Sequence, residues 1–264
     1  MIKLNEVRNE NCLDTMKLME DNFIDLTVTS PPYDNLRTYN GYSFDFESIA
    51  KELYRVTKEG GVVVWVVGDA TVKGCETNTS FKQALFFKEC GFNLHDTMIY
   101  HKEAVGACGS KNGYNQSFEY MFVFTKGKLK TFNPIKDLIP KNAGKPTRYA
   151  KTKSSKKGYN LDAHIKIAPK SSKRQNVWTY KIGFSSRNDR NKHPAIFPEK
   201  LANDHIISWS NEGDLVYDPF MGSGTTAKMS VTNNRYWLGS DTSVEYCDIT
   251  KERINSFKEH LRNI

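Results

Sequence analysis

The chain has 264 residues, a formal net charge of +8 and five scattered cysteines without a Cys-x-x-Cys pair. This composition argues against a disulfide-rich extracellular domain and against a cysteine-held metal site. No apolar run approaches the roughly 18 residues that a membrane span requires, and the first residues lack the apolar stretch of a signal peptide. We therefore expect a protein of the reducing cytoplasm that uses no metal.

One contiguous quarter of the chain carries most of the positive charge. Residues 126–192 contain 19 Lys and Arg but only three Asp, whereas the rest of the chain is net acidic. Such a block is typical of a protein with a polyanionic partner such as nucleic acid, with a solvated basic loop as the alternative. Interleaved aromatic residues fit either stacking on bases or a small core. They are Tyr149, Tyr159, Trp178, Tyr180 and Phe184.

Regular strands and helices are predicted on both sides of this basic block, from apolar runs and helical spacing. Before it come a strand at 23–29, a helix at 47–57, a strand at 62–67, a helix at 81–90, and strands near 96–101 and 119–125. After it come a helix at 199–210, a strand at 214–217, a helix at 223–232, a strand at 235–240 and a helix from about 244. Inside the block the periodicity is weak, so little regular structure is expected. Strands that alternate with helices imply a mostly parallel sheet covered on both faces.

A glycine-rich turn, Asp218–Thr226, follows the predicted strand 214–217. Glycines let the backbone approach a ligand closely and leave the N–H groups of the next helix pointing at it. The turn lacks the lysine of a P-loop, which disfavours a nucleoside triphosphate. Asp241, at the end of the next strand, is placed either to bind ribose hydroxyls or to cap a helix. Together these features predict a cofactor that contains adenosine.

A second turn, Thr29–Tyr33, ends the buried strand 23–29 with the sequence Ser-Pro-Pro-Tyr. Ligands of open α/β sheets lie at this carboxyl edge. The two prolines stiffen the turn, Ser30 adds a hydroxyl acceptor, and Tyr33 adds an aromatic face. On these residues alone, an ordinary turn that ends a strand stays open as the alternative.

Both turns resemble motifs of the DNA amino-methyltransferases, which methylate N4 of cytosine or N6 of adenine. Thr29–Tyr33 resembles their catalytic motif (D/N/S)PP(Y/F), and Asp218–Thr226 resembles their cofactor loop DPFxGSGTT. Further matches are Asn11–Leu13 to GDCL, Glu119–Lys126 to EYxxVFTK, His193–Leu201 to HPAxFPExL, Gly239–Asp241 to GxD, and Glu245-Tyr246 with Arg253-Ile254 to the EY…RI stretch. The catalytic motif precedes the cofactor loop, with the basic block between them, an order that resembles the β class of the family.

This resemblance implies the fold and the division of the chain. The implied fold is a circularly permuted class I methyltransferase, an α/β protein with a Rossmann-like, mixed, mostly parallel seven-stranded sheet, helices on both faces and a basic target-recognition insertion. The implied parts are a catalytic part at 1–132, a target-recognition region at 133–190 and a cofactor-binding part at 191–264. The implied cofactor is S-adenosyl-L-methionine, and the implied partner is double-stranded DNA, without any membrane.

The resemblance also implies site residues. The catalytic residues would be Ser30, Pro31, Pro32 and Tyr33, with Tyr33 as the stacking platform for a flipped base. The cofactor-binding residues would be Asn11, Cys12, Thr29, Asp218, Pro219, Phe220, Gly222, Ser223, Gly224, Thr225, Asp241, His193 and Pro194. DNA contacts are predicted from side-chain chemistry alone at Arg148, Lys156, Lys157, Arg174, Arg187 and Arg190.

Two departures from the family pattern bear on the chemistry. Asn11 stands in place of the usual Asp of GDCL, and its amide can still bond the adenine of the cofactor. Ser30 stands in place of Asp or Asn, which favours N4-cytosine over the alternative, N6-adenine. A non-catalytic DNA-binding protein on this scaffold and an enzyme that acts on RNA stay open, as do a homodimer and a cognate restriction endonuclease as partners. The family implies a cytoplasmic, nucleoid-associated protein encoded by a prokaryote or a phage.

Overall fold

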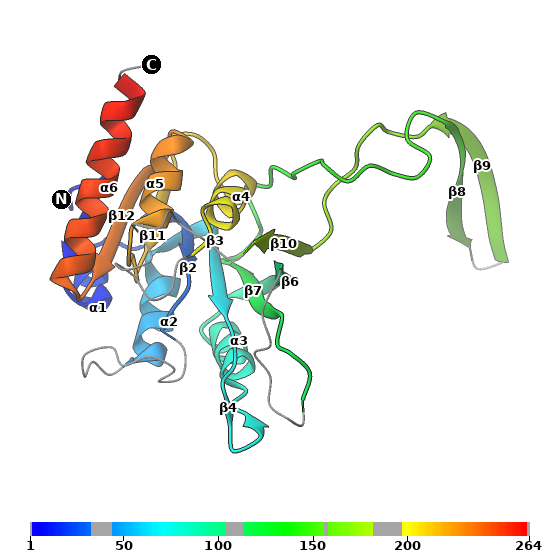
Figure 1. Cartoon of the computed structure of the whole chain (residues 1–264). Helices are drawn as coiled ribbons and strands as arrows, with labels where there is room; N and C mark the ends of the chain where they lie inside the picture. Colours follow the sequence, from blue (N-terminus) through cyan, green and yellow to red (C-terminus); the bar gives the residue numbers. More distant parts are fainter. Residues whose placement is uncertain (1, 33–43, 104–112, 156–157, 182–196, 263–264) are drawn as a thin grey trace. The chain divides into compact units, whose positions relative to one another are not determined.

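The computed structural model of the protein describes residues 2–32, 44–103, 113–155, 158–181 and 197–262 (Figure 1). The chain divides into two compact units. The larger unit joins Met1–Asn133 to Asn176–Ile264, and the smaller unit is Pro134–Gln175. In the described part of the chain, no helix combines the length and the apolar content that crossing a membrane requires.

The larger unit is built on an eight-stranded sheet in the order β1-β12-β11-β2-β3-β7-β6-β10. β7 pairs antiparallel with both of its neighbours, and every other pair in this sheet is parallel. A mixed, mostly parallel sheet is therefore confirmed. The strands are β1 (Glu6–Asn9), β2 (Ile24–Thr29), β3 (Thr57–Val67), β6 (Asn93–Glu103), β7 (Phe118–Thr125), β10 (Val177–Lys181), β11 (Leu215–Asp218) and β12 (Tyr236–Asp241).

The predicted count of seven strands is wrong, because β10 adds an eighth strand at the edge beside β6. Within β10 the buried rings of Trp178 and Tyr180 alternate with exposed side chains, which is the period of a strand buried on one face. The Tyr180 hydroxyl donates to Asp204 Oδ2 at 2.7 Å, and the Trp178 ring lies 4.6 Å from the ring of His205. These two aromatic residues of the basic block thus form core rather than an exposed stacking surface.

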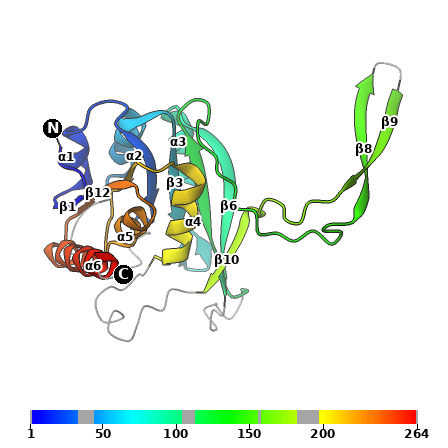
Figure 2. The same ribbon diagram turned by 90° about the horizontal axis from the view of Figure 1, so that it is seen from above.

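Helices cover both faces of the sheet, as predicted (Figure 2). The helices on one face are α1 (Cys12–Lys17), α2 (Phe46–Val56) and α3 (Thr79–Glu89), and those on the other are α4 (Glu199–Trp209), α5 (Thr225–Thr232) and α6 (Val244–Arg262). The core under α1–α3 is rich in aromatic rings, such as Trp65 and Phe87 with centroids 5.1 Å apart. Such edge-to-face pairs stabilise the core beyond the area that they bury.

Local sequence signals explain the predicted elements, whose observed ends lie within five residues of the predicted ones. In α2, Asp45 accepts the N–H of Ser48 as the N-cap, and the buried Ile49, Leu53 and Val56 recur at helical spacing. Sequence reasoning missed β1, α1 and the short hairpin of β4 (Thr71–Val72) and β5 (Cys75–Glu76). These elements have at most six residues each, too few for a periodic signal.

The smaller unit contains a long antiparallel hairpin of β8 (Pro146–Ser155) and β9 (Gly158–Ile167). The expectation of little regular structure in the basic block is therefore wrong here. A two-stranded ribbon forms through backbone pairing and needs no buried apolar face, so its sequence carries no clear alternation. Within the same unit, Arg174 Nε donates to both carboxylate oxygens of Asp137, at 3.1 and 2.9 Å.

His205 gives the fold a measurable response to acid. It is fully buried, with Nδ1 accepting the indole N–H of Trp209 at 3.2 Å, and burial lowers its pKa to about 3. As the pH falls, the His205 side chain therefore takes up a proton in the unfolded state before it does so in the folded state. The free energy of unfolding that is present above about pH 6.5 is lost as the pH falls towards about 3. In urea unfolding across this window, His205→Gln should lose less stability than the wild type. His260→Gln, an exposed control, should follow the wild type; equal losses in all three proteins would contradict the prediction.

Candidate active site

The two predicted turns meet at the carboxyl edge of the central strands. β2 ends at Thr29, β11 ends at Asp218, and these strands are neighbours in the sheet. The Thr29 hydroxyl donates to Asp218 Oδ1 at 2.6 Å, although 189 positions separate the two residues along the chain. The structure thus joins the start of the Ser-Pro-Pro-Tyr turn directly to the start of the glycine turn. Tyr33, the predicted stacking residue, lies outside the described residues.

A buried carboxylate, Asp218, holds this junction together. Besides Thr29, it accepts the hydroxyl of Thr226 at 2.7 Å and the backbone N–H of Phe220 at 3.0 Å. Burial raises the pKa of Asp218 to about 6, although the three hydrogen bonds oppose that rise. Because its oxygens are engaged inside the protein, Asp218 fixes the conformation of the turns. Thr226 was not among the predicted site residues, although it is the last residue of the matched motif.

The glycine turn has a backbone that other residues fit poorly. Gly222 and Gly224 have φ values of 52° and 79°, in the left-handed region that favours glycine. A Cβ on Gly224 would also lie 2.8 Å from the side chain of Thr250. The Thr250 hydroxyl donates to the carbonyl of Gly222 at 2.9 Å, so α6 holds this turn from outside. At the start of α5, Gly224 caps the helix without a side-chain hydrogen bond, so no capping side chain covers the first N–H groups.

Asp241 anchors the other side of the glycine turn. Its Oδ2 accepts the N–H of Gly222 at 2.8 Å, and its Oδ1 accepts the N–H of Ser243 at 2.8 Å. Ser243 in turn accepts the N–H of Tyr246, so Ser243 rather than Asp241 caps α6. Two of the roughly four acceptor positions of the Asp241 carboxylate are used, which leaves capacity for a ligand hydroxyl.

The predicted residues Asn11 and Cys12 lie at the same edge. β1 pairs with β12 so that Asn9 lies opposite Asp241, and the chain reaches Asn11 two residues later. The exposed Asn11 accepts the N–H of Leu13 at 2.9 Å as the N-cap of α1. Cys12 is buried, and burial raises the pKa of its thiol to about 12, so it stays protonated and is a poor nucleophile.

The remaining predicted residues fall into two groups. In the described chain, Pro31, Pro219 and Thr225 are buried, and Ser30, Pro32, Phe220 and Ser223 are half-buried. The Phe220 ring packs against Phe44 and Trp65, at centroid distances of 5.6 and 6.2 Å. Outside the described residues lie His193, Pro194, Lys156, Lys157, Arg187 and Arg190.

Two predicted DNA contacts can be located in the smaller unit. Arg148 is exposed on β8. Arg174 is half-buried, and its guanidinium is engaged by Asp137 within the same unit. That internal pairing gives Arg174 a structural role, whereas Arg148 presents its charge to solvent.

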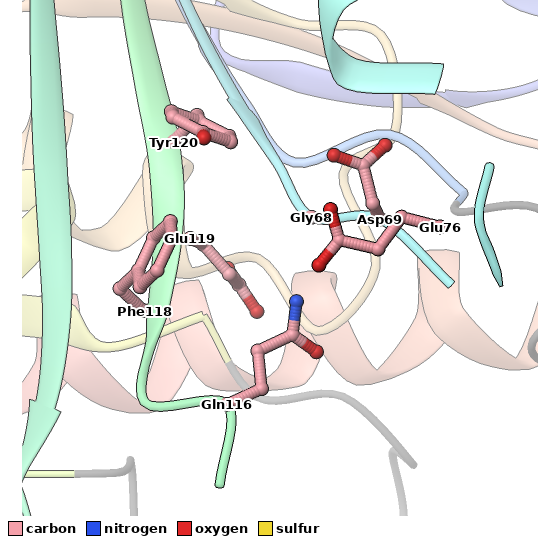
Figure 3. Close-up of a pocket in the computed structure, with 7 residues that line it drawn as sticks. All are labelled: Gly68, Asp69, Glu76, Gln116, Phe118, Glu119 and Tyr120. Carbon is pink, nitrogen blue, oxygen red and sulfur yellow. The ribbon is translucent and has the colours of Figure 1, made fainter. Parts of the chain in front are cut away.

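A small pocket lies further along the same edge, where β3 ends and β7 begins (Figure 3). It lies near the Ser-Pro-Pro-Tyr turn because Trp65 of β3 lies opposite Thr29 in the sheet register. Acidic and aromatic side chains line it. The lining residues are Gly68, Asp69, Glu76, Gln116, Phe118, Glu119 and Tyr120. Asp69 accepts both the backbone N–H and the hydroxyl of Ser80, so it holds the first turn of α3.

Comparison with known proteins agrees with this arrangement. Residues 24–252 match the family model described as DNA methylase. The orphan methyltransferase M.BamHII of Bacillus amyloliquefaciens is 58% identical over 241 residues, which cover 89% of each chain. Among solved structures, the PvuII DNA methyltransferase (cytosine-N4-specific) matches with a TM-score of 0.68 at 18% identity, covering 97% of this chain and 92% of that one.

A second solved structure has the same fold. The putative DNA modification methylase TTHA0409 of Thermus thermophilus, complexed with S-adenosyl-L-methionine, matches with a TM-score of 0.63 at 20% identity, covering 96% of this chain and 95% of that one. These two likenesses confirm the fold of the larger sheet. With the family model spanning most of its length and a curated methyltransferase identical at more than half of the aligned positions, the chain belongs to the DNA methylase family.

Proposed function

We propose that this enzyme transfers a methyl group from S-adenosyl-L-methionine to the exocyclic N4 of cytosine in double-stranded DNA, with S-adenosyl-L-homocysteine as the leaving group and one amine proton released to solvent. The observation that carries the proposal is the hydrogen bond from Thr29 to Asp218, which unites the Ser-Pro-Pro-Tyr turn with the glycine turn. A methyl transfer needs its donor and acceptor side by side, and these turns provide adjoining places for the two. The complex of the TTHA0409 protein with S-adenosyl-L-methionine supports the choice of cofactor.

The residues present fit this cofactor. Glycines at left-handed positions and an α5 start without a side-chain cap suit close approach of an adenosine-containing ligand. Asn11 and the remaining acceptor positions of Asp241 would hold its polar groups, and the Asp218–Thr225 turn would hold the rest. When bound, the cofactor supplies an electrophilic methyl group on a sulfonium centre.

The catalytic turn would activate the amine of the target base. An exocyclic amino group is a poor nucleophile because its lone pair is delocalised into the ring. Ser30 Oγ and the carbonyl of Pro31 would accept its two N–H groups and draw the nitrogen towards tetrahedral geometry, which frees the lone pair. Tyr33 would stack on the base after it flips out of the duplex. No protein nucleophile is needed, in agreement with the protonated Cys12 thiol.

Ser30 in the first motif position favours cytosine, and the cytosine-N4 specificity of the PvuII enzyme supports that choice. Nucleoside mass spectrometry of DNA from cells that express the protein tests it. We expect N4-methylcytosine above the background of cells that carry a Ser30→Ala protein. Detection of N6-methyladenine alone would show that the target is adenine rather than cytosine. The absence of any new methylated nucleoside would favour a non-catalytic DNA-binding protein.

The basic residues would hold the DNA. Within the predicted target-recognition region 133–190, the smaller unit Pro134–Gln175 contains 12 Lys and Arg against two Asp. A two-stranded ribbon such as β8–β9 fits a major groove. A homodimer and a cognate endonuclease remain predictions from the family resemblance.

Arg148 offers a quantitative test of this DNA contact. If it neutralises one phosphate, Arg148→Ala should reduce the slope of log affinity against log salt by about 1 and weaken all sequences alike. Fluorescence anisotropy with duplexes of unrelated sequence at several salt concentrations measures both quantities. Lys251→Ala removes an exposed charge from α6 and should leave the slope unchanged. An unchanged slope in Arg148→Ala would remove this residue from the contact surface.

A further inference from the structure

We propose that Arg253 is a positioning residue that holds the glycine turn in the conformation that binds the cofactor, and that Glu199, itself paired with Lys228, orients Arg253. The inference rests on the proposed function, because the ligand of the turn is taken to be S-adenosyl-L-methionine. In the sequence, Arg253 belongs to the stretch that resembles EY…RI, and that resemblance assigns it no role. The structure places it against the turn from α6.

The contacts of Arg253 with the turn are specific. Its Nη1 donates to the carbonyl of Ser223 at 2.8 Å and lies 3.3 Å from the Ser223 hydroxyl and 3.2 Å from the Thr225 hydroxyl. Its Nη2 donates to Glu199 Oε1 at 2.6 Å. One guanidinium therefore spans the turn and the first residue of α4. The two terminal nitrogens of the planar guanidinium can bond the Ser223 carbonyl and the Glu199 carboxylate at the same time, whereas the single ammonium of a lysine cannot.

The position of Arg253 matters because it works beside Thr250. These residues are three positions apart on α6, so they lie on the same face of the helix. Thr250 binds the carbonyl of Gly222, and Arg253 binds the carbonyl of Ser223. The peptide unit is planar and trans, so fixing the Gly222 carbonyl against α6 turns the N–H of Ser223 to the opposite side. Two consecutive carbonyls are thus held towards α6, and the cofactor would approach the turn from the opposite side.

Glu199 keeps the arginine in this orientation. Burial acts to raise the pKa of Glu199, but hydrogen bonds from Lys228 and Arg253 outweigh it and hold the pKa below its usual value. The carboxylate is therefore charged at neutral pH. Lys228 Nζ, from α5, donates to the same Oε1 at 2.7 Å. The network connects α4, α5 and α6 around the glycine turn, and it reaches the turn at Ser223 and Thr225.

The test is a calorimetric titration of the full-length protein with S-adenosyl-L-methionine. Arg253→Lys keeps the charge but loses the fork, so we expect the Kd to rise about tenfold. Glu199→Gln should raise the Kd about threefold, because the arginine stays in place with less restraint. Lys251→Ala, an exposed residue of the same helix whose side chain pairs with Asp248, should retain the wild-type Kd.

Steady-state kinetics separates positioning from a general loss of structure. In Arg253→Lys the KM for S-adenosyl-L-methionine should rise about tenfold, while the KM for DNA and kcat change less than about threefold. Wild-type Kd values in both Arg253→Lys and Glu199→Gln would overturn the inference and leave the proposed function intact. Equal losses in KM for both substrates and in kcat would also overturn it, in favour of a merely structural residue. A wild-type protein that does not bind S-adenosyl-L-methionine would instead overturn the proposed function.

Discussion

Replacing Asp218 with alanine should lower the free energy of unfolding by about 3–5 kcal/mol and abolish measurable binding of S-adenosyl-L-methionine. The substitution leaves three donors without their acceptor in a buried place: the hydroxyls of Thr29 and Thr226 and the N–H of Phe220. Each buried unsatisfied donor costs about 1–3 kcal/mol. The binding loss follows because the glycine turn and the catalytic turn are no longer tied together.

Urea unfolding and calorimetric titration measure the two effects. Asp248→Ala is the matched control, because Asp248 is an exposed carboxylate of α6 that pairs with Lys251, and its loss should change stability by less than about 0.5 kcal/mol. Asp218→Asn keeps one acceptor oxygen and should fall between the two. If Asp218→Ala were as stable as Asp248→Ala and still bound the cofactor, Asp218 would not be the junction of the site.

Replacing Ser30 with alanine should lower kcat about 100-fold and leave the Kd for S-adenosyl-L-methionine unchanged. The serine oxygen is proposed to accept an N–H of the target amine while positive charge develops on the amine nitrogen. Losing one such preorganised hydrogen bond lowers the rate by a factor of about 10²–10³. The cofactor is proposed to be held by other residues, so its affinity should not depend on this hydroxyl. Radiolabelled methyl transfer and calorimetry provide the two numbers.

Thr27→Val is the matched control for Ser30. Thr27 lies on the same strand, β2, and among the described residues its buried hydroxyl has no hydrogen-bond partner. Valine keeps the shape of threonine and replaces its hydroxyl with a methyl group, so kcat should stay near the wild-type value. A wild-type kcat in Ser30→Ala, or an equal loss in Thr27→Val, would show that Ser30 has no special part in the chemistry.

Most of the larger unit could be predicted from sequence because its signals are local. The run of valines at 62–67 is long and apolar enough to identify a strand buried on both faces. The turns at Thr29–Tyr33 and Asp218–Thr226 could be identified as ligand sites because prolines stiffen the first turn and glycines let a ligand approach the second closely. Their convergence followed from a general rule, that parallel strands bring their carboxyl ends to one edge.

What sequence reasoning missed depends on distant partners. β10 was not predicted because Trp178 and Tyr180 pack against residues far away in the chain, namely Tyr100 of β6 and Asp204 and His205 of α4. The proposed role of Arg253 depends on its contact with Ser223, which lies thirty positions earlier in the chain. No periodic pattern in a single sequence reports such pairings.

The anchoring of β10 constrains how the predicted target-recognition region could be exchanged for that of another protein. Trp178 and Tyr180 contribute to the stability of the larger unit, because they pack against Asp204 and His205 of α4. The same helix begins with Glu199, which is linked to the glycine turn. A chimera that imports a foreign segment through residue 181 would replace half of that interface, whereas a graft that stops at Gln175 keeps the host's own edge strand. The segment that could be exchanged without disturbing the larger unit, Pro134–Gln175, is therefore shorter than the basic block at 126–192.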